Sequence, residues 1–195
     1  MVKKCFKKVT AMLLVVMMLM ATFTVMPVEA KTLSLPEFDT EKTYAIISTT
    51  TNKAVQVREV TWSDAGAVYV DGDVVNSKAK GKVAFKITNQ GDSQYAFASV
   101  GNNGALLKCE NTLSNGISFV FNYDTNVSND HKFTIESVEN GYKLKSYSGV
   151  YLGLGENGRL DKVADDQAEV FVFEEVSVID EYVSIQNVET NKLVS

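Results

Sequence analysis

A short pattern that recurs along the chain decides the fold, and it is most complete at Tyr142-Lys143-Leu144-Lys145-Ser146, which a turn joins to Ser148-Gly149-Val150-Tyr151-Leu152. A tyrosine opens an alternating run, a small polar turn follows, and a second run resumes. Alternation with period two is typical of strands, and Gly, Asn and Ser between the runs are typical of turns. Related segments open at three other tyrosines: Tyr44, Tyr95 and Tyr182.

The spacing of these segments predicts the architecture. The four tyrosines are 51, 47 and 40 residues apart, and a second alternating marker comes late in each of the first three units, at Phe85-Lys86-Ile87, Phe133-Thr134-Ile135 and Phe171-Val172-Phe173. After residue 31 no run keeps the helical spacing of apolar residues. The chain is therefore expected to be all-β. Three units of 40–50 residues favour a β-trefoil, with a β-sandwich as the alternative.

The first thirty residues have the features of a secretory signal. Lys3, Lys4, Lys7 and Lys8 precede a long apolar run, and Val28-Glu29-Ala30 supplies a cleavage site. We expect cleavage after Ala30 and a secreted, extracellular protein. An uncleaved anchor is the alternative, because the apolar run approaches the ~20 residues that span a bilayer.

The net charge limits the classes of partner that the chain can bind, and the cysteine content limits how the domain can be stabilised. Cleavage after Ala30 removes four lysines and Glu29, which leaves 15 basic and 23 acidic side chains and a net charge of −8. Such a chain is poorly suited to nucleic acid or to an anionic membrane surface, where basic side chains supply most of the affinity. Cys109 is then the single cysteine, so the domain must rely on its hydrophobic core. We expect a monomer.

The end of the sequence repeats its beginning. Thr51-Asn52-Lys53-Ala54-Val55 recurs as Thr190-Asn191-Lys192-Leu193-Val194, about three repeat lengths later. This predicts a signal peptide (1–30), a lead-in (31–43), a trefoil (44–176) and the start of a further, truncated repeat (177–195). Alternatively, residues 178–195 add a strand pair to a single domain.

The third unit resembles the fascin-like branch of the β-trefoils. The resemblance rests on the stretch from Val150 to Leu160, with its Tyr-Leu strand and Asn157-Gly158 turn, and on the closing stretch from Ala168 to Glu174; it extends over residues 41–176. In secreted bacterial proteins, such modules often accompany glycoside hydrolases. The resemblance therefore implies an accessory module of a polysaccharide-acting protein. The Gln-x-Trp signature of ricin-type lectins is absent.

Several catalytic and cofactor motifs are excluded by their context. Residues 153–158 match G-x-G-x-x-G, but Asn157-Gly158 is typical of a hairpin turn and no helix follows, so no nucleotide cofactor is expected. His131 is the single histidine and is expected at a strand end, on the side of Phe133 and Ile135. One His and one Cys cannot build a nitrogen–sulfur zinc site.

The acidic residues show no catalytic pattern either. Asp71 and Asp73, like Asp165 and Asp166, occupy turn-like sequence, and neither Asp71-Gly72-Asp73 nor the stretch from Asp124 to Asp130 has calcium-loop spacing. We therefore expect no metal, no cofactor and no enzymatic activity in this segment.

Sugar binding needs an exposed aromatic face and nearby amide or carboxylate groups. The candidate residues lie in all three units: Trp62, Tyr69, Asp71, Asn102, Asn103 and Tyr147. Trp62 could equally plug or cap the barrel. Tyr44, Tyr95, Tyr142, Tyr151 and Cys109 are expected in the core. The expected function is non-catalytic carbohydrate binding; a spacer or protein-interaction module is the alternative, and a protease inhibitor a weaker one.

Overall fold

The computed structural model describes residues 34–58, 66–110, 118–124 and 126–179, so the predicted signal peptide lies outside the described residues. Contacts divide the chain into residues 1–31 and 32–195, and every described residue belongs to the second part. Its helical segments in the described ranges are three 3₁₀ turns of three residues each. None of the described helices has the length and hydropathy needed to cross a bilayer.

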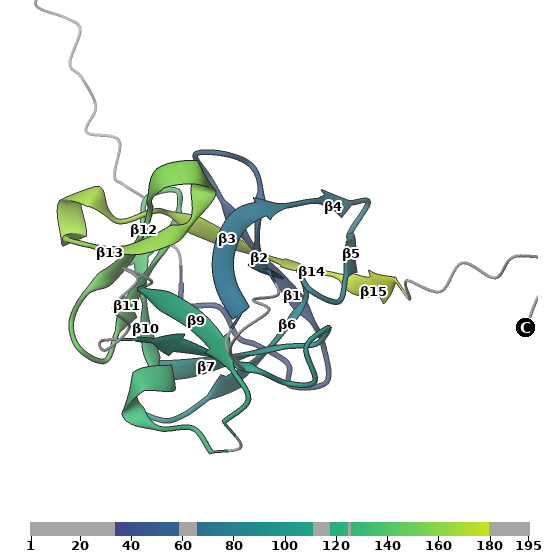
Figure 1. Ribbon diagram of the computed structural model, residues 1–195, viewed down its shortest axis with the longest axis horizontal. Helices are drawn as coiled ribbons and strands as arrows, with labels where there is room; N and C mark the ends of the chain where they lie inside the picture. The colour runs from purple at the N-terminus through teal and green to yellow at the C-terminus, as the bar shows by residue number, and fades with distance from the viewer. Residues whose placement is uncertain (1–33, 59–65, 111–117, 125, 180–195) are drawn as a thin grey trace, which may run out of the picture. The chain divides into compact units, whose positions relative to one another are not determined.

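The described residues form three consecutive units of four strands (Figure 1). The first unit contains β1 (Tyr44–Ser48), β2 (Ala54–Arg58), β3 (Gly66–Gly72) and β6 (Phe85–Asn89). The second contains β7 (Gln94–Ser99), β8 (Leu106–Cys109), β9 (Phe119–Asn122) and β10 (Phe133–Val138). The third contains β11 (Gly141–Ser146), β12 (Tyr151–Leu154), β13 (Leu160–Val163) and β14 (Phe171–Glu175).

The first and fourth strands of each unit close a six-stranded antiparallel barrel. Hydrogen bonding runs from β1 to β6, β7, β10, β11 and β14, and β14 returns to β1. The middle strands form the hairpins β2–β3, β8–β9 and β12–β13. The prediction of an all-β fold with threefold repetition is confirmed, because the tyrosine-led runs are β1, β7 and β11 and the phenylalanine-led runs are β6, β10 and β14. The closed ring excludes a sandwich of two sheets.

The core is rich in phenylalanine. Phe85, Phe97, Phe133 and Phe171 are fully buried within barrel strands, and Phe119 and Phe121 are buried on β9. Of the expected core residues, Tyr44, Tyr95, Tyr151 and Cys109 are buried, whereas Tyr142 is half-buried against the core. In β6 and β10 the alternation of the sequence begins as an alternation of buried and less buried side chains, whereas β1 and β7 bury residues on both faces.

A strap of residues 34–43 lies against the barrel. The Phe38 ring packs edge-on against Tyr44, Tyr95 and Phe173, at centroid distances of 5.2, 5.5 and 5.0 Å. Tyr142 Oη donates to the carbonyl of Ser34 at 2.9 Å. The predicted lead-in thus contributes an aromatic side chain to the core, the role that was considered for Trp62. Trp62 itself lies outside the described residues.

Three equivalent turns follow the tyrosine-led strands. The backbone N–H of Ser48, Ser99 and Ser146 donates to the carbonyl of Lys53, Ala105 and Val150, respectively. Each turn contains a residue with positive φ, at Asn52 (54°), Asn103 (49°) and Gly149 (88°). Asn and Gly tolerate this conformation, which explains why the turns carry these residues.

The hairpin β12–β13 explains the glycine-rich stretch of the third unit. Asn157 and Gly158 both have positive φ, 58° and 75°, within the 3₁₀ turn η2 (Glu156–Gly158). A strand follows the turn, so the prediction that this stretch is a hairpin is confirmed.

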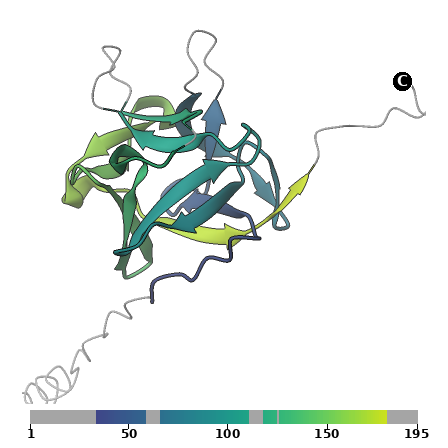
Figure 2. The same ribbon diagram turned by 90° about the horizontal axis from the view of Figure 1, so that it is seen from below.

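The first unit carries an insertion that the sequence pattern did not predict. After β3 the chain forms β4 (Val74–Val75) and β5 (Lys78–Lys80), and β15 (Ser177–Ile179) pairs with β5 in parallel. We call β4, β5 and β15 the side sheet (Figure 2). Residues 180–195 lie outside the described residues, so the further repeat predicted for 177–195 remains a prediction.

Candidate functional site

Two of the predicted sugar-binding residues lie together on β3. The Arg58 guanidinium stacks over the Tyr69 ring at 4.0 Å from its centroid, and the same guanidinium pairs with the Asp71 carboxylate. Asp71 Oδ1 is buried and has no hydrogen-bond partner among the described residues. One face of the Tyr69 ring is therefore covered by Arg58, and the same guanidinium engages Asp71.

The other predicted residues occupy two equivalent turns of different units. Asn102 and Asn103 lie in the β7–β8 turn, where Asn103 is exposed, and Tyr147 opens the β11–β12 turn with 55% of its surface exposed. The structure therefore distributes the described candidates over three units instead of gathering them in one place. Of these turns, the one that follows Tyr147 borders a sizeable pocket.

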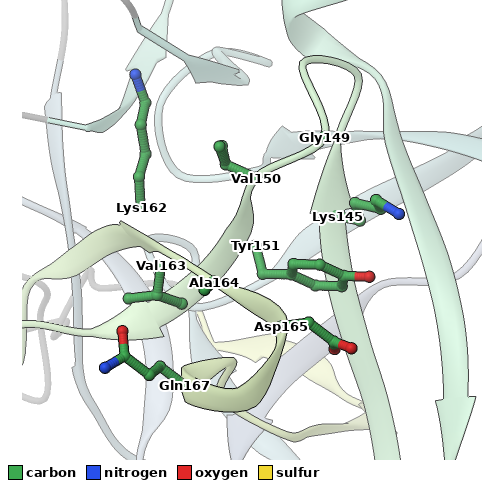
Figure 3. A pocket seen from close by; sticks show the side chains of 9 residues that line it. All are labelled: Lys145, Gly149, Val150, Tyr151, Lys162, Val163, Ala164, Asp165 and Gln167. Carbon is green, nitrogen blue, oxygen red and sulfur yellow. The ribbon is translucent and has the colours of Figure 1, made fainter.

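This third-unit pocket has a volume of about 660 Å³ (Figure 3). It is bordered by β11, the β11–β12 turn, β12, β13 and the 3₁₀ turn η3 (Asp165–Gln167). Its lining residues are Lys145, Gly149, Val150, Tyr151, Lys162, Val163, Ala164, Asp165 and Gln167. The view in Figure 3 shows Tyr151, Lys145 and Asp165 on one side and Lys162, Val163 and Gln167 on the other. The volume falls in the range of small-ligand sites.

One wall of the pocket is held by a carboxylate on the neighbouring strand β10. Tyr151 Oη donates to Glu136 Oε2 at 2.8 Å, and Lys145 Nζ donates to Glu136 Oε1 at 3.4 Å. The Lys145 ammonium also lies 5.1 Å from the centre of the Tyr151 ring. The hydrogen bond to Glu136 raises the pKa of Tyr151, and the hydrogen bond to Tyr151 raises the pKa of Lys145. At neutral pH this wall therefore presents a neutral phenol beside an ammonium group.

A second lysine of β11 fixes the 3₁₀ turn that borders the pocket. Lys143 Nζ donates to both the carbonyl and the carboxylate Oδ1 of Asp165, each at 2.7 Å. These contacts hold the turn η3 against β11. Gln167 at the end of this turn is exposed, and Val150 and Val163 supply apolar surface between the polar groups. The pocket thus combines hydrogen-bonding side chains with apolar surface, as a sugar ring requires.

The first and second units lack this chemistry at the equivalent positions. Lys145 is paired with Tyr151 in the third unit, Ala98 with Leu106 in the second, and Ile47 with Ala54 in the first. Sequence reasoning missed Lys145, Tyr151, Lys162, Asp165 and Gln167 as site residues. The usable signal was that the third tyrosine-led run carries two lysines where the other three runs carry none.

His131 was expected at the end of a strand, on the side of Phe133 and Ile135. It ends the 3₁₀ turn η1 (Asn129–His131), β10 begins two residues later, and His131 is buried as Phe133 and Ile135 are. The ring is fully buried; Nδ1 accepts the backbone N–H of Ser128 at 3.0 Å, and Nε2 lies 3.0 Å from Asn122 Oδ1. Since Nδ1 is an acceptor, Nε2 carries the proton, and the ring ties the β9–β10 connection together.

Ser128 Oγ and Asp124 Oδ2 lie 2.9 and 3.3 Å from the two ring nitrogens, so a serine, a histidine and an aspartate are neighbours. The backbone N–H that occupies Nδ1 competes with the serine for the one lone pair that a general base would use. Burial, the largest effect, lowers the pKa of His131, and Asp124 opposes this. Within the described ranges, no group of three or more His, Cys, Asp or Glu side chains is arranged to hold a metal ion.

The closed six-stranded barrel with three hairpins defines a β-trefoil, and solved structures share it. BEL β-trefoil superposes with a TM-score of 0.55 at 18% identity, covering 74% of this chain and all of that one. The Polyporus squamosus lectin, solved with a Neu5Acα2-6Galβ1-4GlcNAc epitope, has a TM-score of 0.55 at 17% identity, covering 71% of this chain and 50% of its own. A GlcNAcα1-4Gal-releasing endo-β-galactosidase from Clostridium perfringens has a TM-score of 0.54 at 13% identity, covering 70% of this chain and 33% of its own.

At these identities the likeness extends to the fold alone. A scan against protein-family models finds no match, and neither does a search of curated protein sequences. The prediction of a β-trefoil is therefore confirmed by both the strand pairing and the neighbours, whereas its fascin-like branch remains a prediction.

Proposed function

We propose that this chain is a secreted, non-catalytic β-trefoil module that binds a carbohydrate in the third-unit pocket. The observation that carries the proposal is the pocket itself, in which Lys145, Asp165 and Gln167 surround apolar surface of a size that suits one or two sugar rings. The exposed Tyr147 ring, two residues before Gly149, is positioned in sequence to extend this surface.

The solved structures that share this fold support the proposal, although their likeness to this chain extends to the fold alone. One is a lectin with a bound glycan, and another is a glycan-releasing enzyme of which this fold covers a third. Together with the predicted signal peptide, they favour an exported accessory module of a larger polysaccharide-acting protein. The resemblance to fascin-like modules of glycoside hydrolases points the same way.

The test is a binding titration with a panel of soluble and immobilised glycans, including Neu5Acα2-6Galβ1-4GlcNAc. We expect saturable binding that weakens at least tenfold, the equivalent of about 1.4 kcal/mol, in Asp165→Ala and in Gln167→Ala. Asp166→Ala is the matched control, because Asp166 is an exposed neighbour in the same turn that does not line the pocket.

Absence of binding to every glycan would overturn the proposal. Equal losses in Asp165→Ala and Asp166→Ala would reject this pocket as the site. The alternative role, as a protein-interaction module, is favoured by a different observation, the exposed apolar residues of the side sheet.

A further inference from the structure

The His131 ring holds the turn η1 closed through hydrogen bonds that only its neutral form can make. The ring is fully buried, Nδ1 accepts the backbone N–H of Ser128 at 3.0 Å, and Nε2 lies 3.0 Å from Asn122 Oδ1. A neutral imidazole has one donor and one acceptor nitrogen, whereas a protonated ring has two donors. The protonated ring would direct an N–H group at the N–H of Ser128. The closed form of η1 therefore requires the neutral ring.

The charges that act on this ring come from three segments. Asp124 follows β9, Asp130 lies in η1, and Lys108 lies on β8. The two carboxylates favour the protonated ring and the ammonium opposes it, but burial is the largest effect and lowers the pKa of His131. A histidine in contact with water has an ordinary pKa near 6.5. Acid therefore favours a state in which η1 opens and the ring meets water.

The turn η1 is joined by hydrogen bonding to one border of the third-unit pocket. Lys132, the residue after His131, accepts the backbone N–H of Tyr147 with its carbonyl at 3.0 Å. Tyr147 opens the β11–β12 turn, and Gly149 and Val150 in this turn line the pocket. Opening of η1 therefore removes a hydrogen bond that holds this border in place.

We propose that His131 is an acid-sensitive switch: protonation of its ring breaks the hydrogen bond from Ser128, opens η1 and releases the β11–β12 turn beside the third-unit pocket. A ligand held against Gly149 and Val150 is then bound more weakly in acid. The switch is a property of the turn. It does not depend on which ligand the pocket takes, or on whether that ligand is a sugar.

The test is amide hydrogen exchange, followed by NMR at each residue between about pH 4.5 and 8, on the chain from residue 31 to 195. We expect the Ser128 and Tyr147 amides to exchange at least about fivefold faster at pH 5 than at pH 7.5, after correction for the intrinsic rates. The acceleration should begin below about pH 6.5, where a solvated histidine takes up a proton.

The Val100 amide is the control within the same chain. It donates to the carbonyl of Ala84 at 3.0 Å, as Tyr147 donates to Lys132, but the residue before Ala84 is Val83, which has no titratable group. Its corrected exchange rate should not change over this pH range. In His131→Gln the acceleration at Tyr147 should disappear, because a glutamine side chain offers an acceptor and a donor at every pH.

Equal acceleration at Tyr147 and Val100 would overturn the proposal, because acid would then loosen the whole barrel. Protection of Tyr147 that persists unchanged to pH 4.5 would also overturn it, as would an acceleration that remains in His131→Gln. These readouts use no glycan, so their outcome is separate from that of the proposed sugar binding.

Discussion

At the scale of single residues, the three units differ where they join. In each joint, the residue after the turn serine donates its N–H to the residue before a strand phenylalanine: Thr49 to Val170, Val100 to Ala84, and Tyr147 to Lys132. The residue just before each of these carbonyl acceptors is buried: Glu169 precedes Val170, Val83 precedes Ala84, and His131 precedes Lys132. The same position is therefore filled by a carboxylate, an alkyl group or an imidazole.

These differences determine whether the hydroxyl of each buried serine has a hydrogen-bond partner. Glu169 Oε1 accepts a 2.8 Å hydrogen bond from Ser48 Oγ, whereas Ser99 Oγ has no hydrogen-bond partner among the described residues, because its joint carries the apolar Val83. We expect Ser48→Ala to lower the free energy of unfolding by about 1–2 kcal/mol, and Ser99→Ala to leave it unchanged or raise it by up to ~1 kcal/mol. Urea denaturation of both variants measures this; equal destabilisation would contradict the assignment.

The joint that carries His131 predicts that the stability of the fold depends on pH. Burial lowers the pKa of His131 in the folded chain below its ordinary value near 6.5, so the unfolded chain binds the proton more readily. The free energy of unfolding should be at its full value above pH 6.5 and should fall as the pH drops from 6.5 toward the lowered pKa of the folded chain. The charges of Asp124 and Asp130 oppose the lowering of the His131 pKa, and the charge of Lys108 adds to it. Urea midpoints between pH 5 and 8 check it. His131→Gln should flatten the profile relative to the parent chain, and an unchanged slope would reject this source.

At the scale of elements, the strap completes the barrel. Phe38 packs on aromatic rings of the first, second and third units, so it links all three although it precedes them in sequence. We expect Phe38→Ala to lower the free energy of unfolding by ~2–4 kcal/mol, since it removes a large half-buried ring from an aromatic cluster. Leu35→Ala, at an exposed strap position, is the control and should change stability by less than ~0.5 kcal/mol.

Thermal or urea unfolding of the two strap variants measures the difference. A Phe38→Ala chain as stable as Leu35→Ala would show that the strap only lies on the barrel without stabilising it.

The elements also show which features the sequence could predict. Tyr44, Tyr95 and Tyr142 mark short runs of β-forming residues bounded by turn residues, so a local pattern was enough to predict these strands. The side sheet is built from runs of two and three residues that are too short to show a period, and β15 is defined by its partner β5. Trp62, the most prominent aromatic residue of the sequence, lies outside the described residues.

The candidate site could be predicted from the sequence even less completely than the side sheet. Tyr147 was identified from its turn sequence, but the neighbouring pocket depends on Glu136, which contacts Tyr151 only because β10 and β11 are paired. Tyr151 repeats in register with the strands and was assigned to the core, and it is indeed buried. Its hydroxyl also supports a wall of the pocket, because the pairing of β10 with β11 brings Glu136 next to it. A pattern in a single sequence does not encode such a pairing between strands.

At the scale of the whole molecule, threefold repetition does not give three equal sites. The Lys145–Tyr151 pair of the third unit is replaced by Ala98–Leu106 and Ile47–Ala54 in the other units. We expect one glycan-binding site per chain, with a stoichiometry near one in isothermal titration calorimetry. A stoichiometry of two or three would contradict the third-unit assignment, and Ala98→Lys with Leu106→Tyr tests whether this pair is sufficient to create a second site.

The ring of six strands closes between β1 and β14, where Tyr44 pairs with Glu175, 131 residues further along the chain. A barrel of this kind cannot be completed by an N-terminal fragment, because its first strand has no neighbour on one side until the last has been made. Contacts at such sequence separation also slow folding. For the export that the sequence predicts, this order of events would be favourable, because a barrel whose last strand has not yet been made stays open and an open chain can pass through a translocation pore.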